Sequence, residues 1–206
     1  MSSMNRRAFK ELVRTINSRV QHFNTAEIEC LIREFEQLSI SGTVANGLDR
    51  VMFKRMLHTD FGLTDEMIMD RVFRVFDKNK DYSVTVDEWI EGLCVFLRGN
   101  LDEKIKYCFS VYDLDSKQHI SRNEMFSWLK DCLMRQSTEE DHDEGIRDVI
   151  EHTLKKMDHD HDGMVSFKDF NQAVREENLL LEAFGTCLPV PTSVEMYERR
   201  VFWEKL

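Results

Sequence analysis

The chain has 206 residues, and 42% of them are hydrophobic, which is enough to bury a core in one domain or two small lobes. Its formal charge of −10 argues against nucleic acid as a partner. Five scattered cysteines predict free thiols in a reducing compartment, and only two prolines argue against an all-β fold. We expect a soluble helical protein without a disulfide framework.

The sequence also argues against attachment to a membrane. No apolar stretch approaches about 20 residues, so we expect no membrane span. Ser2 follows the initiator methionine where N-myristoylation requires glycine, so we expect no N-myristoyl anchor.

The first predicted element is an amphipathic helix. Apolar side chains recur on one face at helical spacing: Phe9, Leu12, Val13, Ile16, Val20 and Phe23. The other face carries cations: Arg6, Arg7, Lys10, Arg14 and Arg19. We expect the helix to pack on the lobe that follows it; the alternative is that its basic face touches acidic tubulin or lipid.

Residues 41–52 have the spacing of an EF-hand loop without its acids. Leu48 stands at the eighth position, where such loops carry an aliphatic residue. Non-acidic residues fill the first, third, fifth and twelfth positions: Ser41, Thr43, Ala45 and Met52. We interpret the segment as a hand that kept its fold and lost its ion; the alternative is an ordinary helix-loop-helix.

Residues 77–88 read DKNKDYSVTVDE and have the ligand spacing of an EF-hand calcium loop. The predicted ligands are the side chains of Asp77, Asn79, Asp81 and Glu88 and the carbonyl of Ser83. Tyr82 occupies the sixth position, where glycine normally makes the turn, and a side chain at positive φ there costs about 1–2 kcal/mol.

Residues 113–124 read DLDSKQHISRNE and form the poorest of the three predicted sites. The predicted ligands are Asp113, Asp115, the His119 carbonyl and Glu124. Lys117 removes an oxygen from the fifth position and adds a cation, and Gln118 replaces the glycine. We still expect this loop to hold an ion at saturating calcium.

Residues 158–169 read DHDHDGMVSFKD and keep the turn glycine, Gly163. The predicted ligands are Asp158, Asp160, Asp162, the Met164 carbonyl and Asp169. Asp169 is one methylene shorter than the usual glutamate, which favours Mg²⁺ relative to Ca²⁺. The predicted cofactor is therefore Ca²⁺, up to three ions, with Mg²⁺ possible at loop 158–169 when Ca²⁺ is absent.

These loops predict an all-α fold of four EF-hand helix-loop-helix units in two paired lobes. We expect an N-lobe at residues 1–98 with loops 41–52 and 77–88, and a C-lobe at residues 99–178 with loops 113–124 and 158–169. Val84, Ile120 and Val165 are predicted to make short β contacts between neighbouring loops. Ser137 with Glu140 is typical of a capping box that opens a helix.

The C-terminal tail, residues 179–206, is apolar and is predicted to end in a short helix that carries Val194, Tyr197, Val201 and Phe202. We expect the tail to pack over the C-lobe and to compete with a partner.

Four longer runs exceed what an EF-hand loop demands: FGLTDEMIMDRVFR from Phe61, EWIEGLCVFLRGNLDEKIKYCF from Glu88, TLKKMDHDHDG from Thr153 and LLLEAFGTCLP from Leu179. Through them the chain resembles the neuronal-calcium-sensor-like EF-hand group and, within it, the calaxin family, calcium sensors of ciliary outer-arm dynein. The resemblance implies a location in the cytoplasm and in the axoneme of the cilium or flagellum. It also implies calcium-dependent binding to a dynein heavy chain, with links to tubulin in the microtubule and to docking-complex proteins.

The leading hypothesis is a non-enzymatic calcium sensor that opens an apolar groove and regulates the motor. The groove would be lined by Phe73, Phe76, Trp89, Leu93 and Phe96, with Met52 and Met56 from the degenerate hand. The alternatives are a regulatory subunit of another target, such as a phosphatase or a channel, and a calcium buffer. An enzyme is not expected, because the chain has no glycine-rich phosphate loop and no recognisable nucleophile motif.

Overall fold

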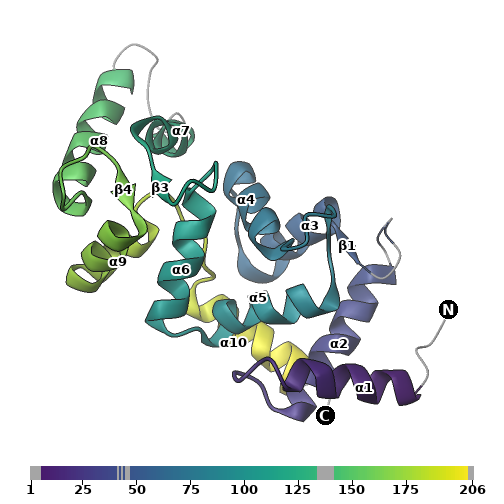
Figure 1. Ribbon diagram of the computed structural model, residues 1–206. Coiled ribbons are helices and arrows are strands. Elements are labelled where there is room, and N and C mark those ends of the chain that lie inside the picture. Colours follow the sequence, from purple (N-terminus) through teal and green to yellow (C-terminus); the bar gives the residue numbers. More distant parts are fainter. Residues whose placement is uncertain (1–5, 41, 43, 45–46, 134–141, 204–206) are drawn as a thin grey trace. The chain divides into compact units, whose positions relative to one another are not determined.

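The computed structural model describes residues 6–40, 42, 44, 47–133 and 142–203 (Figure 1). Within these residues the chain is mainly helical with a few short strands, which confirms the predicted all-α fold. The chain forms two compact units, Met1–Asn100 together with Pro189–Leu206, and Leu101–Leu188. The predicted Ser137–Glu140 capping box lies outside the described residues. No helix among the described residues combines the length and apolar character that crossing a membrane requires.

The first unit contains two helix-loop-helix hands. Its elements before residue 101 are α1 (Arg6–Asn17), α2 (Thr25–Ile40), β1 (Leu48–Asp49), α3 (Arg50–Phe61), α4 (Glu66–Phe76), β2 (Ser83–Val84) and α5 (Val86–Arg98). The end of the chain adds the helix α10 (Pro191–Glu198) and the π-helical turn η2 (Arg199–Trp203).

The second unit contains the other two hands. Its elements are α6 (Leu101–Tyr112), β3 (His119–Ile120), α7 (Arg122–Leu133), α8 (His142–Met157), β4 (Val165–Ser166), α9 (Phe167–Glu176) and the 3-10 turn η1 (Asn178–Glu182). The helices α7 and α8 pack against each other, and α9 packs against both α6 and α8.

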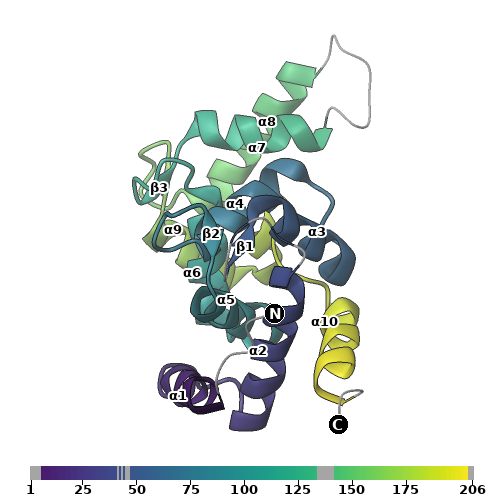
Figure 2. The ribbon, with the colours of Figure 1, turned by 90° about the vertical axis from the view of Figure 1, so that its right-hand side faces the viewer.

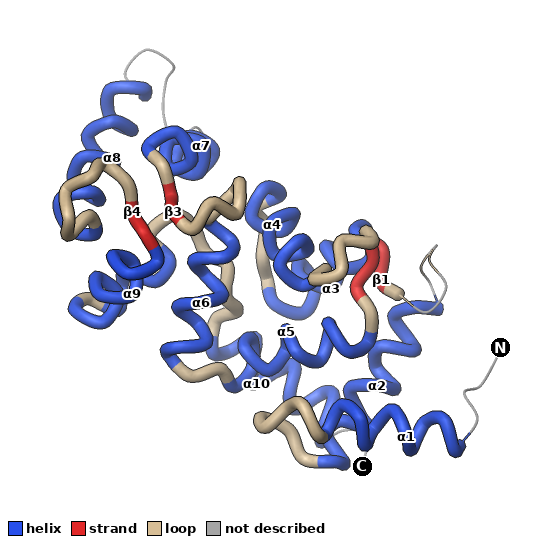
Figure 3. Tube along the Cα trace, viewed as in Figure 1, coloured by secondary structure: helices blue, strands red, loops and turns tan. Residues whose placement is uncertain are grey.

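Each unit joins its two loops by one antiparallel strand pair, drawn in red in Figure 3. Leu48 of β1 lies opposite Val84 of β2, and Ile120 of β3 lies opposite Val165 of β4. All four side chains are buried. The predicted β contacts at the eighth loop position are therefore confirmed, and the degenerate loop keeps this contact as well.

The core of the first unit is built from aromatic side chains that face inward from its hands. The ring of Phe53 on α3 lies 5.5 Å from Phe73, 4.9 Å from Phe76 and 6.5 Å from Trp89, measured between centroids. Edge-to-face contacts of this kind stabilise a core beyond the area that they bury. Three of the residues predicted to line the groove thus meet on Phe53.

The helix α1 packs against α2 and buries Val13 and Ile16. This confirms the predicted packing of the N-terminal helix on its own lobe. Its cationic side chains remain at the surface: Arg6, Arg7, Lys10 and Arg14.

The tail is divided between the two units, and the expected packing over the second unit alone is wrong. The turn η1 packs with α6 and α9 in the second unit. In the first unit α10 packs against α3 and α5, and η2 packs against α2 (Figure 2). The ring of Tyr197 lies 5.0 Å from that of Phe61, and the ring of Phe202 lies 6.0 Å from that of Phe23.

Arg98, at the end of α5, links the tail to the body of the first unit. Its guanidinium donates to Glu198 Oε1 at 2.7 Å and to the two carboxylate oxygens of Glu27 at 2.7 and 3.1 Å. The rings of Phe23 and Phe202 lie 5.0 and 5.6 Å from the guanidinium carbon, within the range of cation–π attraction. Burial raises the pKa of Glu27, but its hydrogen bonds to Arg98 outweigh burial and leave that pKa lowered.

Candidate metal centres

Each loop with predicted ligands is closed by the aspartate at its first position. Asp77 Oδ1 accepts from the backbone N–H of Asp81 at 3.1 Å, and Asp77 Oδ2 accepts from that of Tyr82 at 2.9 Å. Asp113 and Asp158 accept in the same way from the fifth and sixth residues of their loops, at 2.9 and 2.8 Å and at 3.2 and 2.9 Å. The first carboxylate therefore holds the turn through which the other ligands converge.

The turn places the fourth and sixth residues of each loop in the left-handed conformation. The φ values are 59° and 66° for Lys80 and Tyr82, 55° and 67° for Ser116 and Gln118, and 60° and 84° for His161 and Gly163. Glycine adopts such a φ without a side-chain penalty, whereas other residues lose about 1–2 kcal/mol. Positive φ at Tyr82 is confirmed, and the loop backbone forms without glycine.

The fourth loop brings three carboxylates together. One oxygen each from Asp158, Asp160 and Asp162 lie within 4.8 Å of one another, and within the described part of the chain this is the one group of at least three His, Cys, Asp or Glu side chains that does so. Oxygens that surround one calcium ion at about 2.3–2.6 Å lie at most about 5 Å apart. The donor set of this loop therefore fits a hard divalent cation.

The second loop combines two carboxylates with an amide. Asn79 Oδ1 accepts from the N–H of Asp81 at 2.9 Å, and Asp81 Oδ1 accepts from the N–H and the hydroxyl of Ser83 at 2.9 and 2.8 Å. The hydrogen bonds from Ser83 lower the pKa of Asp81 and keep its carboxylate ionised. The third and fifth positions thus present oxygens that suit calcium.

The third loop carries the cation that its sequence predicted. Lys117 Nζ lies 2.5 Å from Asp115 Oδ2, and both side chains are largely exposed. The hydrogen bond to Asp115 raises the pKa of Lys117 and so keeps the ammonium charged. A metal ion must compete with this ammonium for the carboxylate at the third position.

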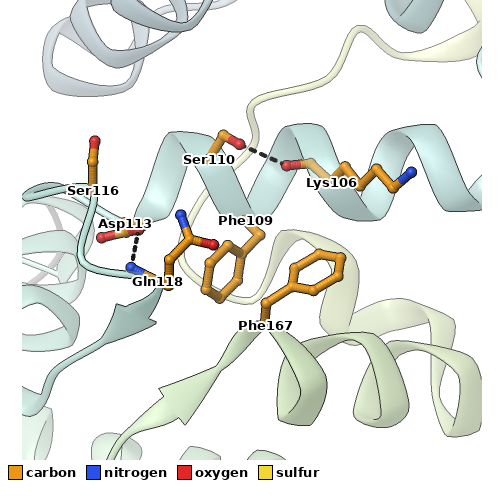
Figure 4. A pocket seen from close by; sticks show the side chains of 7 residues that line it. All are labelled: Lys106, Phe109, Ser110, Asp113, Ser116, Gln118 and Phe167. Carbon is orange, nitrogen blue, oxygen red and sulfur yellow. Dashed lines mark hydrogen bonds between the residues drawn. The ribbon is translucent and has the colours of Figure 1, made fainter.

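A hollow of about 290 Å³ lies beside the third loop. Its lining comes from α6, the loop and the start of α9 (Figure 4): Lys106, Phe109, Ser110, Asp113, Ser116, Gln118 and Phe167. The rings of Phe109 and Phe167 pack edge to face with centroids 5.3 Å apart. Asp113 is the one carboxylate of this lining, so the hollow does not offer the several oxygens that a calcium ion requires.

The twelfth residue links each loop to its exit helix. Glu88 Oε1 accepts from the N–H groups of Lys78 and Asn79 at 2.9 and 3.1 Å, across the loop. Its other oxygen accepts from the N–H and the hydroxyl of Thr85 at 2.9 and 2.8 Å, at the start of α5. Glu124 repeats this pattern in the third loop.

Asp169 reaches less far than the two glutamates. Its hydrogen bonds among the described residues all go to Ser166, with the N–H at 3.1 Å and the hydroxyl at 2.5 Å. Ser166 and Thr85 each form a capping box with the twelfth residue of their loop. The missing methylene thus confines Asp169 to its own helix start, and the ninth residue, which the sequence marked as oxygen-bearing, serves as a helix cap.

The degenerate loop is described only in part, because residues 41, 43, 45 and 46 lie outside the described residues. Asp49 accepts from the N–H of Met52 at 2.8 Å and caps α3. Met52 itself is buried in the core. The position that carries a ligand in the other loops thus serves apolar packing here.

The structure places every predicted side-chain ligand in the loop that the spacing assigned to it. The carbonyls of Ser83, His119 and Met164 and the filling of each site stay predictions. Sequence reasoning missed the buried contacts of the tail. The apolar run from Leu179 was a signal for burial, but not for the surfaces that cover it.

Residues 102–175 match the family model of an EF-hand domain pair, and residues 68–93 match that of an EF hand. Calaxin from Danio rerio is 55% identical over 204 residues, which cover 97% of this chain and 96% of the relative. Calaxin from Homo sapiens is 55% identical over 203 residues, covering 97% and 96%. A type 2 calcineurin subunit from Homo sapiens is 29% identical over 157 residues, covering 75% and 86%.

The four hands, the loop geometry and these similarities define an EF-hand calcium sensor. More particularly, the chain belongs to the calaxin family, as the longer sequence runs predicted.

Proposed function

We propose that the protein regulates ciliary or flagellar outer-arm dynein by binding its heavy chain in response to calcium, and so tunes axonemal motility and waveform. The similarity to calaxin over nearly the whole chain supports this role through the resemblance described above. The observation that carries the sensing step is the bond pattern of Glu88 and Glu124, which ties each loop to the first turn of its exit helix.

Calcium supplies the charge and the coordination preference, and the protein supplies oxygens on three loops. We propose up to three Ca²⁺ ions, at loops 77–88, 113–124 and 158–169. The fourth loop would hold Mg²⁺ when Ca²⁺ is absent, because Mg²⁺ needs fewer protein ligands and Asp169 is short.

The first unit converts ion capture into exposure of apolar surface. Glu88 lies in the first turn of α5, so turning both of its oxygens toward an ion draws that end of the helix inward. Trp89, Leu93 and Phe96 follow on the same helix and are buried. Movement of α5 would therefore uncover the groove in which a partner helix docks its apolar residues.

The tail competes with the partner in the first unit. Because α10 packs against α3 and α5, it covers surface that a docking helix needs. A chain that ends at Leu188 should bind a dynein-derived helical peptide more tightly than the full chain in chelator. The variant Tyr197→Ala, which keeps the chain length, should shift the affinity in the same direction; unchanged affinity in both variants would contradict the competition.

Further partners and the location follow from the resemblance alone. We propose contacts with tubulin and with docking-complex proteins, and a location in the cytoplasm and the ciliary axoneme. The exposed cations of α1 offer a surface for acidic tubulin segments. The proposed role is regulatory and non-enzymatic.

A second candidate function is regulation of a phosphatase, which the similarity to the calcineurin subunit favours. Affinity capture from ciliated cells, with and without Ca²⁺, separates the two. Full-length protein should recover dynein heavy chain with Ca²⁺, Glu88→Gln should recover much less, and Glu36→Gln, an exposed control on α2, should match the parent. Recovery of a phosphatase catalytic chain in place of dynein would favour the second candidate.

A further inference from the structure

Two cysteine thiols lie in contact within the second unit. Cys108 is on α6 and Cys187 is in the tail, and their sulfur atoms are 3.5 Å apart. Both side chains are fully buried. A disulfide requires sulfur atoms about 2.05 Å apart, so bond formation needs a movement of about 1.5 Å.

Polar groups fix the tail segment that carries Cys187. The hydroxyl of Tyr112 donates to the Gly185 carbonyl at 2.5 Å, and the hydroxyl of Tyr107 donates to the Cys187 carbonyl at 3.2 Å. Glu182 Oε1 accepts from the Cys187 N–H at 2.8 Å. These bonds come from α6 and from η1, so the two sulfur atoms are held together by the packing of the tail on α6.

We propose that Cys108 and Cys187 form a reversible disulfide when the protein meets peroxide, which staples the tail to α6 within the second unit. The proposal stands independently of the dynein role. Hydrogen peroxide oxidises one thiol to a sulfenic acid and releases water. The second thiol then attacks that sulfur, the S–S bond forms, and the hydroxyl leaves as water with the thiol proton. Two thiols and one peroxide thus give one disulfide and two waters.

The burial of the pair sets the rate and the product. Burial raises the pKa of the Cys108 thiol well above its usual value, with the contact to Cys187 acting in the same direction, so little thiolate forms while the tail is packed. Oxidation therefore proceeds when the segment around Cys187 opens. Once one sulfur is a sulfenic acid, its partner stands beside it, and ring closure outruns further oxidation.

The staple acts at the point where the tail leaves the second unit. The chain passes into the first unit directly after Leu188. Fixing Cys187 to α6 therefore shortens the free length of tail that can leave with α10. It also closes a long loop of chain, which restricts the unfolded state and raises the thermal stability of the unit.

The test uses the full-length protein, treated with hydrogen peroxide, quenched by an alkylating agent and digested without reductant for mass spectrometry. We expect a linked pair of peptides containing Cys108 and Cys187, lost on adding dithiothreitol, and a rise in Tm of about 5 °C or more. The variant Cys94→Ser, in the first unit, should keep the linked pair, and Cys187→Ser should lose it.

Two outcomes would overturn the proposal, and both are read on the unmutated chain, so folding of the variants does not decide them. One is recovery of Cys108 and Cys187 as free thiols while the other cysteines are oxidised. The other is their recovery as sulfinic or sulfonic acids, or linked to different cysteines.

Discussion

The third and fourth loops share one unit and one backbone path, yet they differ in chemistry. Both are closed by a first-position aspartate, and both place the sixth residue at positive φ, Gln118 at 67° and Gly163 at 84°. The fold of the loop therefore depends on Asp113 or Asp158 more than on glycine.

The difference between the two loops lies at the fifth and twelfth positions. Lys117 pairs with Asp115, whereas the corresponding Asp162 joins its neighbours in a cluster of carboxylates. Glu124 spans its loop, whereas Asp169 stays at its helix start. The comparison teaches that loop shape and ion preference have separate causes.

The largest expected effect comes from removing the first carboxylate of the fourth loop. Asp158→Asn removes a ligand charge and one acceptor of the turn, so calcium affinity at this loop should fall on the order of 100-fold. Calorimetric titration should find one ion fewer per chain at micromolar calcium. Asp148→Asn, at an exposed position on α8, removes the same charge and should leave the count unchanged.

The next effect repairs the third loop. Lys117→Asp removes the competing ammonium and supplies an oxygen, so calcium affinity there should rise about 10- to 100-fold. Lys155→Asp, an exposed charge reversal on α8, is the matched control. Equal affinity gains in both variants would mean that the overall charge, and not the contact with Asp115, limits this loop.

The twelfth position should exchange properties between the loops. Asp169→Glu should raise the preference for Ca²⁺ over Mg²⁺ about tenfold, because the longer side chain can give two oxygens. Glu124→Asp should lower that preference in the third loop. Competition titrations of Ca²⁺ against Mg²⁺ measure both, and an unchanged ratio in the two variants would refute the role of the methylene.

The smallest effect concerns the sixth position. Gln118→Gly removes about 1–2 kcal/mol of backbone strain, which raises calcium affinity up to about tenfold if the strain is relieved in the unfilled loop. Gly163→Ala should lose a similar amount in the fourth loop. Calcium affinities of the two variants, measured side by side, should move in opposite directions; movement in the same direction would contradict the strain argument.

The sequence predicts the parts of this molecule that depend on local spacing. The ligand positions, the eighth-position strand contacts and the conflict at Lys117 all lie within twelve residues of their cause. The tail could not be placed in the same way, because the apolar character of Tyr197 and Phe202 is compatible with several surfaces. The contact of Cys108 with Cys187 likewise depends on packing between segments far apart in the chain.

The most direct test of the account is a calcium titration of the full-length protein in millimolar Mg²⁺, followed with a dye that fluoresces on exposed apolar surface. The account predicts that fluorescence rises as the loops fill and saturates with them, and that Glu88→Gln reduces the rise. Calcium binding without any change in dye fluorescence would contradict the claim that ion capture opens a groove.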